Sequence, residues 1–128
     1  MATEGQQFKH SFIAGADLSA KQYYFMKLSA ADTVVVCAGT TDKPIGVLQN
    51  APTAGQAAEV CYFGETKISG DADLAYGDNI GTSADGQAAA YTVSDTTKHL
   101  VGIVLIDNGA AGGLITALIN CANSRTLA

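Results

Sequence analysis

The sequence predicts an all-β fold, as a small β-barrel or sandwich-like domain. Short runs rich in β-branched and aromatic residues alternate with turn residues, which is typical of strands joined by short loops. The chain has 14 glycines and no long run of strong helix formers, which disfavours helices. Several short strands at regular spacing indicate a barrel or a sandwich.

The second half of the chain repeats short motifs of the first half in the same order, which predicts two pseudo-repeats, 13–63 and 68–119. Such halves would pair around a shared core within one β domain, residues 13–122, between an extended N-terminal arm (1–12) and a polar tail (123–128). Coincidence is the alternative, because Ala, Gly and Asp are common here. The matched motifs are IAGADL at 13–18 with ISGDADL at 68–74, SAAD at 29–32 with SADG at 83–86, IGVL at 45–48 with VGIV at 101–104, and AG at 54–55 with AG at 111–112.

The first half contains four predicted strands. Residues 22–28 are apolar on both faces, which predicts a strand covered on both sides. A turn at 29–32 joins them to the β-branched run 33–37, and the two segments form a hairpin. Residues 45–48 form a short strand, and 57–63 form another that Gly64 ends.

The second half contains four more. Residues 79–82 and 87–93 flank a turn whose Asp85-Gly86 pair favours a hairpin, because glycine adopts positive φ readily. Residues 100–106 and 114–119 form the last hairpin. Gly46 and Gly102 occupy matching strands, where a glycine marks a bulge, a sharp bend or a close backbone approach.

The charge pattern excludes several classes of partner. Seven Lys and Arg against twelve Asp and Glu give a net charge of −5, which argues against nucleic-acid binding. The sequence also lacks a run of basic residues for an anionic membrane, and its polar start does not resemble a secretory signal. Only 15% of residues are charged and 48% are hydrophobic, so we expect exposed apolar surface and therefore a homo-oligomer or docking on a larger assembly.

The three cysteines, Cys37, Cys61 and Cys121, are odd in number and form neither a CxxC motif nor a Cys/His cluster. This pattern predicts free structural thiols in a reducing cytoplasm rather than a disulfide framework or a zinc site.

The sequence predicts no catalytic, metal or cofactor site. His10 and His99 are expected to be solvated loop or strand-edge residues. Asp71 and Asp73 form a D-x-D pattern, but the glycine and glutamate that a calcium loop requires are missing. The glycine-rich segment at 109–113 is not followed by the helix and lysine of a phosphate-binding loop. We therefore expect a protein that is not an enzyme.

Three segments resemble the capsid decoration, or head cement, proteins of tailed bacteriophages: FIAGADLSAKQYYFMKL at 12–28, KPIGVLQNAP at 43–52 with AG at 54–55 and EV at 59–60, and VGIVL at 101–105. The resemblance covers residues 12–119. It implies a structural virion protein that binds the outer surface of the expanded capsid and stabilises it. The implied partners are the major capsid protein of the same phage and further copies of this chain, most often as a trimer, next as a dimer. The implied location is the virion, after assembly in the host cytoplasm.

In that family an N-terminal arm often contacts the capsid. Here the candidate contact residues are Gln6, Phe8, His10 and Phe12. Their even spacing would let them face the same way on a strand added to a partner sheet, and the polar arm would be mobile in the free protein. The alternative is that Phe8 and Phe12 complete this protein's own barrel.

Two other classes of function are alternatives. One is a small-ligand or glycan-binding β module, for which the sequence offers four tyrosines: Tyr23, Tyr24, Tyr62 and Tyr91. The other is an enzyme whose site forms only at a subunit interface.

Overall fold

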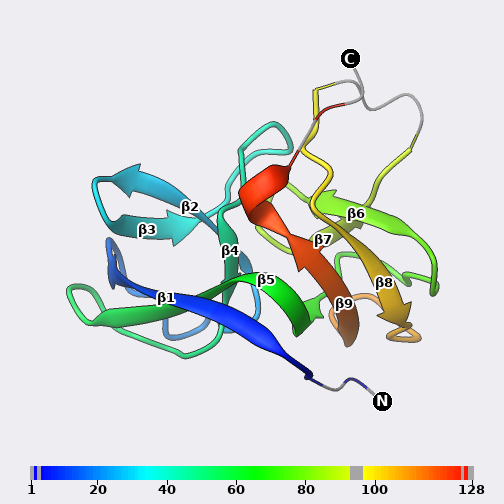
Figure 1. Ribbon diagram of the computed structural model, residues 1–128, viewed down its shortest axis with the longest axis horizontal. Coiled ribbons are helices and arrows are strands. Elements are labelled where there is room, and N and C mark those ends of the chain that lie inside the picture. Colours follow the sequence, from blue (N-terminus) through cyan, green and yellow to red (C-terminus); the bar gives the residue numbers. More distant parts are fainter. Residues whose placement is uncertain (1, 3, 93–96, 125, 127–128) are drawn as a thin grey trace.

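Strands that are distant in sequence pair into one continuous sheet in the computed structural model, which describes residues 2, 4–92, 97–124 and 126 (Figure 1). The described residues form nine strands and one short 3₁₀ helix, so the all-β prediction is confirmed. The elements are β1 (Gln7–Ala14), β2 (Phe25–Ala30), β3 (Thr33–Val36), β4 (Gly46–Leu48), β5 (Ala57–Ser69), β6 (Asn79–Thr82), β7 (Ala88–Ala90), β8 (Gly102–Ile106), β9 (Leu114–Asn120) and η1 (Cys121–Asn123).

The first five strands close into a ring in the order β1-β3-β2-β4-β5, because β1 pairs with both β3 and β5. The β1–β5 pairing is antiparallel and extends from Gln7 to Ile13. The β1–β3 pairing is parallel and short, at Ile13↔Thr33 and Ala14↔Val34. Strand β1 is therefore part of this protein's own sheet, so the boundary expected between an arm and the β domain at residue 12 falls inside a strand.

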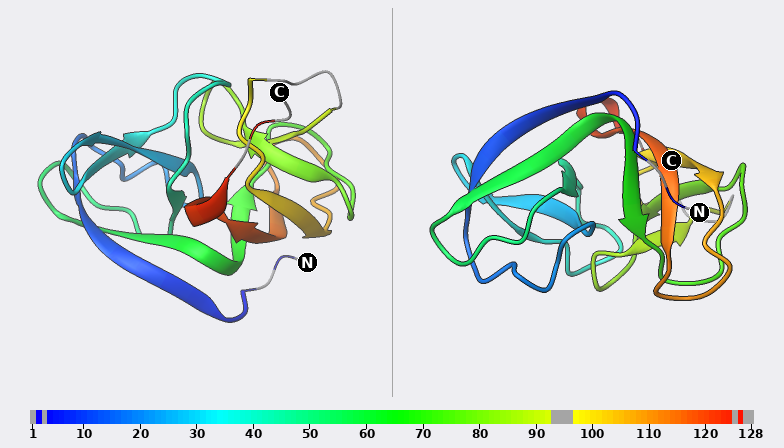
Figure 2. Two further views of the ribbon diagram at one scale, coloured as in Figure 1. Left: turned by 45° about the horizontal axis from the view of Figure 1, so that its top comes forward. Right: turned by 90° about the horizontal axis from the view of Figure 1, so that it is seen from below.

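The second part of β5 starts another ring, in the order β5-β9-β8-β6-β7. Its strands pair as in the first ring: β6–β7 as β2–β3, β6–β8 as β2–β4, and β8–β9 as β4–β5. A single parallel bridge, Gly70↔Ala88, takes the place of the β1–β3 pairing. Figure 2 shows the two rings beside each other, with β5 (green) reaching from one into the other. The repeat boundaries 13–63 and 68–119 stay a prediction. The strand pairings of the two rings correspond as a duplication of the chain would require.

Strand β5 does not end at Gly64 as the sequence suggested, but continues to Ser69. Gly64 has φ +127°, and a Cβ there would lie 2.2 Å from the carbonyl oxygen of Gln6. Glycine thus lets the strand turn while the N-terminal segment passes against it, and it ends neither the strand nor its pairing.

The buried hydrophobic residues form two cores: a first core within the first ring, and a second, larger core that residues of both halves of the chain share, among them Val47 and Ile80. Neighbouring residues on one strand point into different cores: Phe25 into the second and Met26 into the first. The strand predicted at 22–28 is thus covered on both sides at Phe25 and Met26, but it begins at Phe25, and Leu28 is 51% exposed. The first core comprises Ala14, Leu18, Met26, Val34, Leu48, Ala58 and Val60; the second comprises Phe25, Cys37, Val47, Cys61, Ile68, Leu74, Ile80, Ala88, Val101, Val104, Ile115, Ala117, Ile119 and Cys121.

The three cysteines are free and buried, and all belong to the second core. Burial raises the pKa of the Cys37 thiol to about 12 and also raises the pKa values of Cys61 and Cys121. Cys121 is only 3% exposed although it lies near the C-terminal end, because η1 turns it inward behind β9.

Candidate functional site

A bulge interrupts the β1–β5 pairing beside the four candidate contact residues. Phe8 lies opposite Phe63, but the next residue, Lys9, lies opposite Cys61, so Tyr62 is the extra residue of a bulge. Gln6 and Phe8 border one hollow, and His10 and Phe12 border another. The Phe8 and Tyr62 ring centroids are 6.4 Å apart, so Tyr62 adjoins both pairs. That the four residues form a single contact surface stays a prediction.

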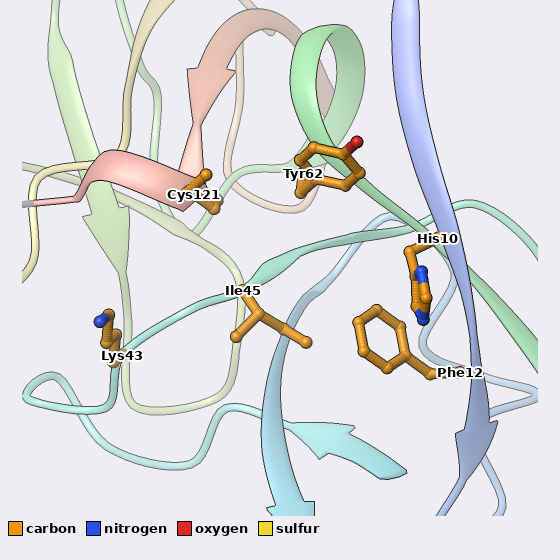
Figure 3. A pocket seen from close by; sticks show the side chains of 7 residues that line it. His10, Phe12, Lys43, Ile45, Tyr62 and Cys121 are labelled. Atoms are coloured by element: carbon orange, nitrogen blue, oxygen red, sulfur yellow. The ribbon is translucent and has the colours of Figure 1, made fainter. Parts of the chain in front are cut away.

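The hollow beside His10 and Phe12 has a volume of about 440 Å³. Figure 3 shows the two rings next to each other on β1, with Tyr62 across from them and Lys43 at the far side. The His10 and Phe12 ring centroids are 4.4 Å apart at 61°. His10 Nε2 is 3.1 Å from Asp32 Oδ1, and both side chains are more than half exposed, so this contact contributes little to stability. The remaining lining residues are Ile45, Cys121 and Ala122.

The hollow beside Gln6 and Phe8 is smaller, about 240 Å³, and is lined mainly by apolar groups. The Phe8 and Phe63 ring centroids are 5.5 Å apart at 74°, an edge-to-face arrangement that holds both rings in place. The other residues that line this hollow are Leu118, Gly64 and Glu65, and Glu65 is the acidic one.

This second hollow opens on a row of exposed apolar side chains, which we term the apolar strip: Phe8, Phe63, Leu118 and Ile103. They are 51%, 43%, 47% and 36% exposed, in that order. Ile103 lies directly opposite Leu118 in the β8–β9 pairing, so the strip continues from the start of β1 across β5 and β9 to β8. Contiguous apolar surface of this kind marks a contact with a partner.

Three members of the strip, Phe63, Ile103 and Leu118, were not candidates from the sequence. Residues 114–120 place Leu118 on the face that also carries Thr116 and Asn120, which is the signal that could have marked it as outward-facing. Phe63 faces outward because it adjoins the bulge at Tyr62, for which the sequence carries no signal.

The four tyrosines proposed for a ligand-binding module do not converge. Lys67 Nζ lies 5.8 Å from the Tyr23 ring centroid, and Lys21 Nζ lies 4.9 Å from that of Tyr24. The Tyr91 hydroxyl donates to the Lys98 carbonyl oxygen. Of the four, Tyr62 lines a hollow described above.

The described part of the chain contains neither a metal-type cluster of side chains nor a helix suited to cross a membrane. Among those residues, no three His, Cys, Asp or Glu side chains are grouped as a metal site would need. In the same residues, no helix has the length and apolar character to cross a membrane.

Comparison with known proteins places this architecture among phage-head structures. The head fiber gp8.5 N base of bacteriophage phi29 superimposes with a TM-score of 0.68 and 19% identity, over 91% of this chain and 96% of that chain. A chain from the capsid of Myoviridae phage XM1 superimposes with a TM-score of 0.59 and 16% identity, over 91% of this chain and 84% of that chain. At these identities the likeness shows the fold. No protein-family model and no curated protein sequence matches the chain. The resemblance to phage-head proteins noted in the sequence is thus confirmed at the level of fold.

Proposed function

We propose that this protein is a structural component of a tailed-phage head that attaches to the outer surface of the capsid as a decoration or cement protein. The observation that carries the proposal is the fold: nearly the whole chain superimposes on nearly the whole base of a phage head fiber. A second neighbour comes from a phage capsid. Neither neighbour is described as an enzyme, so a binding role without catalysis agrees with both.

The partner in this proposal is the major capsid protein of the same phage. The protein acts as a homo-oligomer, with a trimer favoured over a dimer. Linking several copies on one shell raises the effective concentration of each contact. It reaches the virion after assembly in the host cytoplasm, and it stabilises the shell by bridging capsid subunits.

The apolar strip is the surface that we assign to the shell. Phe8 and Phe63 hold each other edge to face, so little side-chain entropy is lost when a partner covers them. Full burial of a leucine is worth about 1.5–3 kcal/mol, and Leu118 is 47% exposed. Covering Leu118 therefore contributes roughly half of that value, which corresponds to about three- to tenfold in affinity.

Co-sedimentation tests the proposal, using expanded heads of the encoding phage prepared without this protein. The wild-type protein should sediment with the heads. Leu118→Ser should bind about three- to tenfold more weakly, whereas the control Leu28→Ser should bind like the wild type, since Leu28 is 51% exposed but lies on β2 outside the strip. Failure of the wild-type protein to bind would refute the proposal, and equal binding by both variants would remove the strip from it.

A further inference from the structure

Glu65 is the acidic residue among those lining the second hollow, and its backbone is firmly held. Its N–H donates to the Gln6 carbonyl oxygen at 2.9 Å. Its own carbonyl oxygen accepts from the Gly5 N–H at 3.2 Å and from Gln7 Nε2 at 3.0 Å. The side chain lies against Gly5, where a Cβ would come within 2.9 Å of its Cδ. The Glu65 backbone thus has a fixed place at the edge of a hollow whose other lining residues are Gln6, Gly64 and three apolar side chains.

The described residues offer this carboxylate no counter-ion. Within that part of the chain the ion pairs are His10–Asp32 and Lys27–Asp42. Lys67, two residues further along β5, extends toward the Tyr23 ring instead. The negative charge of Glu65 therefore has no cationic partner among the described residues, on a protein whose net charge is already −5.

The size of the hollow limits what can fill it. Its volume of about 240 Å³ is below the range of about 300–1,000 Å³ that small-molecule sites occupy. A single long side chain would fit a hollow of this volume. Because Phe8, Phe63 and Leu118 form its walls, that side chain needs an apolar stem.

The Glu65 carboxylate determines which charge a side chain that fills the hollow can carry. An apolar side chain would cover Glu65 and leave its charge without water or a partner, which is costly, and an acidic side chain would be repelled. Arginine or lysine satisfies both parts: the stem lies on the apolar walls, the cation meets Glu65, and the aromatic faces attract it further.

We propose that the hollow formed by Gln6, Phe8, Phe63, Glu65 and Leu118 receives one arginine or lysine side chain from the surface to which the protein attaches. This inference rests on the proposed function, since it supplies the chemistry of the capsid partner: a protruding basic side chain within an apolar surround. Basic side chains on the shell complement the acidic character of the whole chain, which also accelerates encounter at low salt.

The test measures binding of Glu65→Gln to the same expanded heads at low and high salt. Glu59→Gln is the matched control, since it removes the same charge from a half-buried position on the same strand, within the first ring. Glu65→Gln should bind about tenfold more weakly at low salt and lose much of the salt dependence of the wild type, while Glu59→Gln should keep both. Unchanged melting temperatures establish that both variants are folded.

Each outcome has one meaning. If the wild-type protein fails to bind heads, both the inference and the proposed function are refuted. If the wild type binds and Leu118→Ser weakens binding while Glu65→Gln does not, the occupant is apolar and only this inference is overturned. If Glu65→Gln alters self-association in light scattering but not head binding, the hollow contacts a second copy of this chain, and the inference is again wrong.

Discussion

Replacing Gly46 by alanine should destabilise the protein severely. A Cβ at Gly46 would lie 2.4 Å from the Cys61 carbonyl oxygen and 2.4 Å from Val60 Cγ1. Carbon atoms in ordinary contact are about 3.5–4.0 Å apart, so β4 or β5 would have to move by about 1 Å or more. Overpacking typically costs about 1–3 kcal/mol. Because the clash is with β5, which belongs to both rings, we expect a cost of about 3 kcal/mol, at the upper end of that range.

For a domain of this size, about 3 kcal/mol lowers the melting temperature by roughly 10–15 °C. Thermal unfolding followed by circular dichroism measures the shift, and urea unfolding gives the free energy directly. Gly102→Ala should also destabilise, since its Cβ would lie 2.6 Å from the Leu118 carbonyl oxygen. Gly39→Ala is the control, because nothing lies closer than 3.8 Å. If Gly46→Ala melts within about 3 °C of the control, which is under 1 kcal/mol, the close approach of β4 to β5 is refuted.

Two further predictions concern the thiols and the start of β1. In the folded protein Cys37, Cys61 and Cys121 should react with a thiol reagent at pH 8 far more slowly than in urea, because burial raises their pKa values and limits access; fast labelling of any one without urea would contradict this. Deleting residues 1–7 together with Phe8→Ala should lower the melting temperature by several degrees, since it removes the backbone bonds to Glu65 and the two aromatic contacts of Phe8; an unchanged melting temperature would return the segment to the role of a free docking strand.

Much of the strand pattern followed from the sequence because it depends on local signals. The predicted strand at 79–82 matches β6, and the turn at Asp85-Gly86 joins it to β7. The first hairpin was also predicted, but β2 starts at Phe25 rather than at residue 22. Tyr23 has φ +69°, and a run of aromatic residues does not predict this conformation.

The features that the sequence did not reveal depend on partners distant in the chain. Gly64 looks like a strand end, yet pairing with β9, which is distant in sequence, continues past it to Ser69. The same holds for the site. Gln6 and Phe8 were candidates because of their position near the N-terminus, but the hollow they border is completed by Glu65 and Leu118 from β5 and β9. Only the fold brings those strands together.

The sharing of β5 between the two rings limits how the chain can be divided. A fragment that ends at Ser69 holds every strand of the first ring, and it leaves the remainder without the strand on which β9 pairs. A fragment that starts at Ala57 has the opposite effect and opens the first ring at both β1 and β4. A duplicated protein with a complete set of strands in each half could melt in two steps. In this chain both rings need the same strand, β5, to close. We therefore expect the two halves to unfold together, and a load applied to either ring to pass through β5 into the other.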